Sequence, residues 1–237
     1  DAGLPSPADP KRYRVLAVVM LGSILGPIDA SMVNTILPSI TRSFASPLAA
    51  AEWVPMAYLL TIGSLALFFG RLGDIWGYRR VFAAGIAAFT AASALCGLAP
   101  SMGALVAFRA LQGLAASTLM SVPLAILTGV FPPNERGKAL GLCAISISVG
   151  LALGPSLGGL LASTLGWRAA FFINLPIGTA AALLAWTRLP DLKGRGGTMD
   201  FAGALLAVAG LGSFLYLVTK VQQEGFALRT AVILSVA

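Results

Sequence analysis

Residues 70–80 read Gly70-Arg71-Leu72-Gly73-Asp74-Ile75-Trp76-Gly77-Tyr78-Arg79-Arg80. This charged, glycine-rich stretch separates two apolar runs, Trp53 to Phe69 and Val81 to Leu98, each close to the length that crosses a bilayer. Its glycines permit a tight turn and a close approach of helices, and Asp74 at a helix end can pair with a basic residue or a helix N-terminus. By itself the stretch predicts a short connection between two antiparallel membrane helices, and an ordinary basic cytoplasmic turn would look the same.

The pattern of apolar runs and short polar connections extends over the whole chain. Hydrophobic residues make up 57% and charged residues 11%, with a mean hydropathy of +0.88. A soluble domain is about 25% charged, so a soluble globule is excluded and an all-α integral membrane protein is predicted. Apolar runs predict helices at Val15 to Leu37, Trp53 to Phe69, Val81 to Leu98, Met102 to Thr128, Ala139 to Leu165, Ala169 to Trp186 and Phe201 to Val218, and a further run opens at Thr230.

Polar segments divide the chain into four parts. We expect a cytoplasmic tail at 1–14, a six-helix bundle at 15–188, a cytoplasmic glycine-rich linker at 189–200, and an additional helix with the start of the next at 201–237. Six helices split into two triples, and many secondary transporters are built from inverted three-helix repeats. Because the chain lacks an initiator methionine and stops within an apolar run, we interpret it as part of a longer protein whose carboxy-terminal half is missing.

Basic residues are distributed unevenly between the predicted connections. The net charge of +7 does not indicate nucleic acid binding, because the basic residues follow the membrane topology. With a cytoplasmic N-terminus, eleven lie inside and four outside, as the positive-inside rule requires. The inside set is Lys11, Arg12, Arg14, Arg71, Arg79, Arg80, Arg136, Lys138, Arg188, Lys193 and Arg195, and the outside set is Arg42, Arg168, Lys220 and Arg229.

Only Asp29 and Arg109 place a charge deep inside a predicted span. Each costs about 2.5–3.5 kcal/mol near the membrane midplane, so a chain keeps such a group where it is paired or functional. At 1.5 Å per residue, Asp29 lies about 21 Å above the inner end of its helix and Arg109 about 11 Å below the outer end of its own. In a core about 30 Å thick these depths differ by about 2 Å, so both side chains could face one cavity.

Two further patterns mark helix faces. Arg109, Gln112, Gly113 and Ala116 share one face of the fourth helix, where small residues let another helix approach. A purely structural arginine, bonded to neighbouring backbone, is the alternative. In the fifth helix Gly150, Gly154 and Gly158 form a small-residue groove, followed by Gly159, and Pro155 removes a backbone donor and bends the helix.

These motifs together resemble the major facilitator superfamily. Residues 70–80 resemble its signature loop, G-x-L-x-D-x-x-G-x-[RK]-[RK], although Ile75 and Tyr78 stand where members often have arginine, which weakens the charge relay of the loop. The resemblance assigns gating or conformational roles to Gly70, Gly73, Asp74, Gly77, Arg79 and Arg80. Residues 109–113 resemble the R-x-x-Q-G element, which the family associates with proton coupling.

Three more motifs narrow the resemblance to drug:proton antiporters with 14 helices. Residues 150–159 resemble the antiporter signature G-x-x-x-G-P-x-x-G-G, which implies conformational roles for Gly150, Gly154, Pro155, Gly158 and Gly159. Residues 29–38 resemble D-x-x-x-x-N-x-x-x-P, and residues 167–178 resemble W-R-x-x-F-x-I-N-x-P-x-G. The short linker at 189–200 fits two extra helices between the halves better than the long central loop of a 12-helix relative.

The resemblance implies a proton-coupled multidrug efflux transporter in the plasma membrane that works by alternating access. Its partners would be the lipid bilayer, protons and a lipophilic or cationic small molecule. Proton or substrate binding falls to Asp29, Arg109, Asn34 and Gln112, and Met32 and Trp53 are candidate wall residues.

Other functions remain as alternatives. They are uptake or exchange of a small solute, and a non-transporting sensor or scaffold that kept the fold. Enzyme activity has no support, because the chain has no histidine, no paired carboxylates in one segment and no phosphate loop. Cys96 and Cys143 lie in separate helices without ligand spacing and are interpreted as packing residues, so no cofactor or metal is expected.

Overall fold

The structure, a computed structural model, describes residues 11–192 together with Gly203, Leu206, Ala209, Gly210 and Ser213. Within this part of the chain six spans have the length and composition to cross a membrane: Lys11–Phe44, Leu48–Trp76, Tyr78–Gly97, Met102–Val130, Arg136–Thr164 and Ala169–Arg188. All six helices predicted between residues 15 and 188 are therefore confirmed. Residues 11–14, predicted to belong to the tail, are helical in the structure. The rest of the predicted tail at 1–14, most of the linker, and the helices predicted after it lie outside the described residues.

Three of the six spans are built from two helical pieces. The first consists of α1 (Lys11–Ser23) and α2 (Leu25–Phe44), the second of α3 (Leu48–Ala51) and α4 (Trp53–Trp76), and the sixth of α8 (Ala169–Phe172) and α9 (Asn174–Arg188). The other three spans are single helices, α5 (Tyr78–Gly97), α6 (Met102–Val130) and α7 (Arg136–Thr164). At the junctions the backbone bonding continues, since Ile28 N donates to Ile24 O at 3.1 Å and Ile173 N to Ala169 O at 3.0 Å.

The predicted loop at residues 70–80 is almost entirely helical, which corrects the prediction. α4 runs on to Trp76, and only Gly77, with φ at +90°, separates it from α5. A residue with a side chain rarely adopts this φ, so the sharp reversal depends on glycine. The prediction ended the helix at its first charges, but Arg71 and Asp74, three residues apart on α4, pair at 3.2 Å and continue the helix beyond the apolar core.

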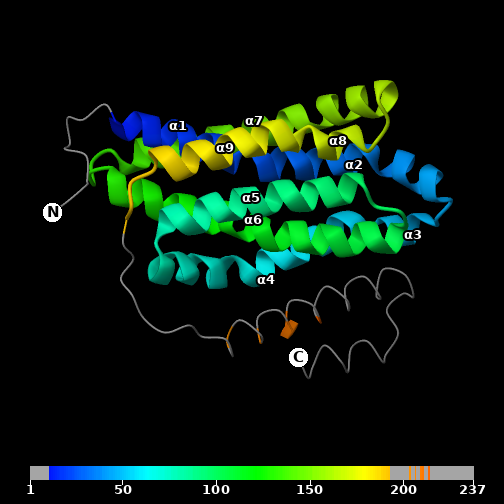
Figure 1. Ribbon diagram of the computed structural model, residues 1–237, viewed down its shortest axis with the longest axis horizontal. Coiled ribbons are helices and arrows are strands. Elements are labelled where there is room, and N and C mark those ends of the chain that lie inside the picture. The colour runs from blue at the N-terminus through cyan, green and yellow to red at the C-terminus, as the bar shows by residue number, and fades with distance from the viewer. Residues whose placement is uncertain (1–10, 193–202, 204–205, 207–208, 211–212, 214–237) are drawn as a thin grey trace.

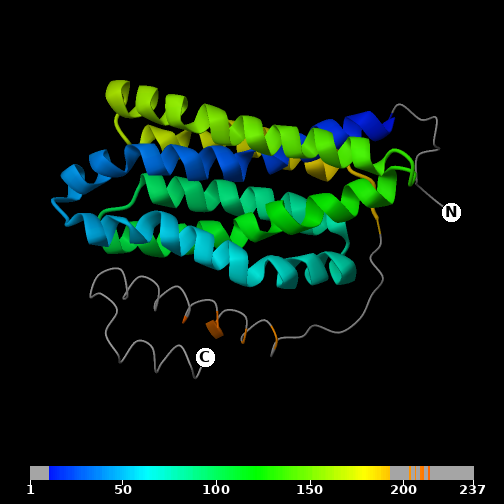
Figure 2. The ribbon, with the colours of Figure 1, turned by 180° about the vertical axis from the view of Figure 1, so that it is seen from behind.

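The six spans pack in the pattern that an inverted repeat predicts (Figures 1 and 2). α6, the fourth span, packs against α4 and α5 of the first triple. The first span in turn packs against the second triple, with α2 on α7 and α1 on both α7 and α9. α5 and α9, the third members of the two triples, pack against each other and so connect these two groups of helices. Short connections make the equivalent helices of the two triples run in opposite directions.

Buried apolar residues form two clusters, and the intramembrane charges lie between them. The first cluster includes Leu25 on α2 and Ala115 on α6. The second cluster includes Met32 on α2 and Leu105 on α6. Asp29 lies between Leu25 and Met32 on α2, and Arg109 lies between the two corresponding residues on α6. Met32 is fully buried within its cluster, and its place on a cavity wall stays a prediction.

Candidate functional site

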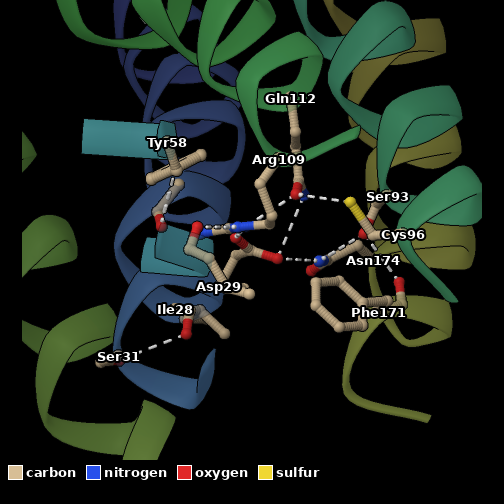
Figure 3. A network of polar contacts seen from close by, with 12 residues as sticks. Ile28, Asp29, Ser31, Tyr58, Ser93, Cys96, Arg109, Gln112, Phe171 and Asn174 are labelled. Carbon is tan, nitrogen blue, oxygen red and sulfur yellow. Dashed lines mark hydrogen bonds and ion pairs between the residues drawn. The ribbon is translucent and has the colours of Figure 1, made fainter. Parts of the chain in front are cut away.

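Asp29 of α2 and Arg109 of α6 form a fully buried ion pair, both with 0% of the side chain exposed (Figure 3). Arg109 Nη1 contacts Asp29 Oδ2 and donates to Gln112 Oε1 at 2.6 Å, while Arg109 Nε donates to the Val54 carbonyl at 3.3 Å. The guanidinium carbon lies 4.0 Å from the centre of the Tyr58 ring, a cation–π geometry. The arginine is thus held from α4 and α6 as well as by the carboxylate.

The second carboxylate oxygen of Asp29 accepts two amide hydrogen bonds. Gln112 Nε2 donates to Asp29 Oδ1 at 3.1 Å, and Asn174 Nδ2 donates to it at 3.0 Å. Asn174 Nδ2 also lies 3.0 Å from Ser93 Oγ, and Ser93 Oγ donates to the Phe171 carbonyl at 2.9 Å. The network therefore joins α2, α5, α6 and the α8–α9 junction around one carboxylate (Figure 3).

This arrangement favours a charged pair despite its burial. An isolated ion in a low-dielectric interior is costly, whereas a paired one with its remaining lone pairs satisfied is tolerated. Asp29 has Arg109 on one oxygen and two amides on the other. Arg109 Nη2 is buried and makes no hydrogen bond within the described residues. The carboxylate of Asp29 is thus the charge on which this network centres.

The sequence placed three members of this network correctly and missed others. Asp29, Arg109 and Gln112 meet as their depths and helical spacing predicted. Asn34 does not join them, because it is exposed on α2, and Trp53 is half-buried outside the network. The missed members are Tyr58, Ser93, Cys96 and Asn174; Cys96 Sγ, interpreted as a packing residue, lies 3.5 Å from Gln112 Oε1. Asn174 did leave a signal, as a lone amide in an apolar run.

The glycine-rich motif at residues 70–80 forms a second polar cluster. Asp74 accepts from Arg71 Nη1 at 3.2 Å and from the Tyr78 hydroxyl. Tyr78, expected to weaken the charge relay, therefore supplies a donor of its own. A Cβ on Gly73 would lie 2.7 Å from the Tyr78 ring, so glycine is what lets this ring approach α4. Arg79 Nη2 pairs with Asp191 Oδ2 at 3.2 Å, which ties the chain after α9 to the loop.

The glycines of α7 bring this helix close to α2. A Cβ on Gly154 would collide with the Ser31 side chain, and one on Gly158 would lie 3.0 Å from the Met32 carbonyl oxygen. Ser31 Oγ donates to the Gly150 carbonyl at 3.3 Å. The predicted small-residue groove is thus occupied by the helix that carries Asp29. Gly159 and Pro155 lie away from it: a Cβ on Gly159 would meet no atom within 4 Å, and Pro155 is exposed.

A cavity of about 200 Å³ lies beside Tyr58, whose ring also contacts the Arg109 guanidinium. Tyr58 lines it, and the hydroxyl of this residue donates to the Gly26 carbonyl at 3.4 Å. Tyr58 thus contacts both the cavity and the Arg109 guanidinium. Other lining residues are mainly apolar and come from α1, α2, α4, α6 and α7, among them Ala30, Leu59, Met120 and Leu151.

Six membrane-length helices in two opposed triples, with an ion pair between them, are the architecture of a secondary transporter. The chain belongs to the Major Facilitator Superfamily, whose family model matches residues 19–237.

Curated relatives agree with this assignment. The chain is 39% identical over 211 residues to puromycin resistance protein pur8 of Streptomyces alboniger, covering 88% of this chain and 42% of the relative. It is 35% identical over 208 residues to multidrug resistance protein Stp of Mycobacterium tuberculosis, with 87% and 39% covered. It is 34% identical over 198 residues to riboflavin transporter RibZ of Clostridioides difficile, with 83% and 43% covered. The chain thus spans less than half the length of these curated relatives.

Solved structures show the same fold at low sequence identity. A peptide transporter POT in complex with sulfate superimposes with a TM-score of 0.71 at 16% identity, covering 98% of this chain and 51% of that one. A bacterial homologue of the human lysosomal transporter Spinster gives 0.69 at 22% identity, covering 89% and 51%.

Proposed function

We propose that the chain forms the amino-terminal part of a proton-coupled multidrug efflux transporter in the plasma membrane. In this proposal the protein exchanges lipophilic, often cationic, compounds for protons by alternating access, together with a carboxy-terminal half. The observation that carries it is the fully buried pair of Asp29 and Arg109. The resistance and multidrug names of the relatives pur8 and Stp support export as the direction.

Asp29 is the proposed proton carrier. Its carboxylate is the centre of the network, with Arg109 on one oxygen and the amides of Gln112 and Asn174 on the other. Protonation neutralises Asp29 and releases Arg109 from its counter-ion. Arg109 keeps the Val54 carbonyl, Gln112 and the Tyr58 face as partners, so it stays in place while its charge becomes uncompensated.

The apolar part of the cargo is proposed to bind in the cavity beside Tyr58. This cavity offers a mainly apolar lining and an aromatic edge, which suit a lipophilic compound. Because Tyr58 both lines the cavity and contacts Arg109, a bound compound contacts the same residue that stabilises the guanidinium. Cargo thus acts on Arg109 through Tyr58, and the proton acts on it through Asp29. Asn34, exposed on α2, remains a candidate for contact with cargo only.

The proposed motions involve the two glycine motifs. Gly150, Gly154 and Gly158 let α7 lie directly on α2, so movement of one carries the other. The Asp74 cluster, with Gly70, Gly73, Gly77, Arg79 and Arg80 around it, is proposed to be the gate at the cytoplasmic end.

Uptake is the second candidate, because the name of the relative RibZ gives a solute, riboflavin, without resistance or export. The direction of transport separates the two. If the protein is an exporter, cells that express the intact gene accumulate less ethidium than cells without it, and collapse of the proton gradient removes the difference. An importer gives higher accumulation of its solute.

The mechanism is tested with Asp29→Asn in the intact gene product. Asparagine keeps the volume and hydrogen bonding but removes the titratable charge, so membrane insertion stays normal while proton-driven ethidium transport in everted vesicles falls by about tenfold or more. The matched control is Glu52→Gln, which neutralises an exposed carboxylate and leaves transport unchanged. Transport by Asp29→Asn at the parental rate, with the same dependence on pH, contradicts the proposal.

A further inference from the structure

A groove of about 620 Å³, larger than the cavity beside Tyr58, lies between α4 and α5 with α6 as its floor. Its walls are almost entirely apolar: Phe69 comes from α4, Ala88 from α5 and Leu114 from α6. The groove extends toward Gly77, the short connection between α4 and α5. This connection lies at the end of the bundle at which α1 begins. The groove does not include any member of the Asp29 network, so it belongs to neither the proton site nor the cargo cavity.

The end of the bundle at which this groove opens is strongly basic. Among the described residues, nine lysines and arginines lie at this end and two at the other. Its three described carboxylates are paired, Asp74 with Arg71, Glu135 with Arg12 and Asp191 with Arg79. The nine are Lys11, Arg12, Arg14, Arg71, Arg79, Arg80, Arg136, Lys138 and Arg188, and the two are Arg42 and Arg168.

Arg80 is the one charged residue among those that line the groove. It is exposed, and within the described part of the chain it makes no ion pair or hydrogen bond. Its neighbour Arg79 differs, because Asp191 compensates that charge at 3.2 Å. The groove therefore has a long apolar part and a single uncompensated cation at its polar end.

Two tryptophans mark the mouth of the groove. Trp76 is 65% exposed and Trp186 is 55% exposed, and both line the groove. Indole rings are enriched where the hydrocarbon meets the headgroups. Their position places the polar end of the groove at headgroup level and its apolar part within the hydrocarbon.

We propose that this groove binds an anionic phospholipid, with an acyl chain between α4 and α5 and the phosphate beside Arg80. Basic pockets between membrane helices are suited to such headgroups, and each arginine near the surface contributes measurably to the attraction. The lipid would fill the space between the two helices that Gly77 joins, next to the Asp74 cluster. The proposal does not depend on the direction of transport or on proton coupling.

The apolar residues that follow the linker are the other possible occupant. Leu206, which belongs to this stretch, is 73% exposed, so this side chain does not fill the groove. An apolar segment would also leave the charge of Arg80 without a counter-ion. The experiment below distinguishes it from a lipid.

The test uses the fluorescence of Trp76 and Trp186, which a bromine atom quenches only at short range. The purified intact gene product is reconstituted in vesicles that contain dibrominated phosphatidylglycerol or dibrominated phosphatidylcholine at equal mole fraction. We expect the relative affinity for phosphatidylglycerol to be about fivefold higher, the effect of one arginine. Arg80→Gln removes the preference, Arg80→Lys retains it, and Arg14→Gln, an exposed arginine at the same end, leaves it intact.

A second pair of variants tests the location. Ala88→Phe fills the groove and reduces quenching by both lipids, while Ala87→Phe, exposed on the same helix but outside the groove, does not. Equal affinity for the two lipids in the parent, or quenching unchanged by Ala88→Phe, overturns the proposal. So does efficient disulfide formation between cysteines placed at Ala88 and Leu206, which would show that the groove holds a segment of the same chain.

Discussion

Asn174, the first residue of α9, donates a hydrogen bond of 3.0 Å to the buried carboxylate of Asp29 on α2. The same amide lies 3.0 Å from Ser93 on α5, so it connects three spans at the depth of the ion pair. The sixth span is interrupted directly before it, at Ile173. This hydrogen bond therefore links the carboxylate of Asp29 to the point where α8 and α9 meet.

Asn174→Ala should impair transport without preventing folding. It removes one of two amide donors from Asp29 Oδ1, and a hydrogen bond to a charged group contributes about 1.5–3 kcal/mol. If this bond matters equally to turnover, proton-driven ethidium transport in everted vesicles falls by about tenfold. Asn134→Ala, an exposed asparagine in the connection before α7, serves as the control. If Asn174→Ala transports at the parental rate, the prediction is wrong and this amide contributes to packing only.

Arg109→Ala should destabilise the protein more than its combination with Asp29→Asn does. Removal of one partner leaves a buried, uncompensated carboxylate and costs about 3–5 kcal/mol. The second change removes that charge, and residues in direct contact are not additive. The thermal midpoint of the purified intact gene product in detergent measures this, with Arg42→Ala at an exposed arginine as the control. Additive losses in the double variant would mean that the two side chains do not stabilise each other.

The sequence predicted the number and positions of the first six helices because apolar length is a property of each segment alone. The meeting of Asp29 and Arg109 was also predictable, since depth in the membrane follows from distance to the helix ends. Tyr58 and Ser93 could not be recognised, because their roles depend on which helices pack side by side. The sequence did not predict the extension of α4 past Phe69, because the apolar run ends at the first charged residue. The helix itself continues as long as its backbone hydrogen bonds continue.

Gly154→Ala and Gly159→Ala should differ sharply although both glycines lie on α7. A Cβ on Gly154 would collide with the Ser31 side chain, and overpacking of this kind costs about 1–3 kcal/mol. A Cβ on Gly159 meets no atom within 4 Å, so alanine there gains about 1 kcal/mol of helix propensity. Thermal midpoints in detergent should therefore move in opposite directions. Equal shifts would show that α2 and α7 are not held at the distance described.

The orientation of the bundle can be tested with single cysteines at two exposed positions, one at each end of the bundle. Lys138 lies just inside α7 at the basic end, and Pro47 lies between the first two spans at the other end. The excess of basic residues around Lys138 predicts a cytoplasmic location for it and an external one for Pro47. A membrane-impermeant maleimide added to intact cells should label only a cysteine at position 47, and everted vesicles should give the reverse. Cys96 and Cys143 are both buried, so neither should contribute to the labelling. External labelling at position 138 would reverse the topology, and with it the placement of the Asp74 cluster at a cytoplasmic gate.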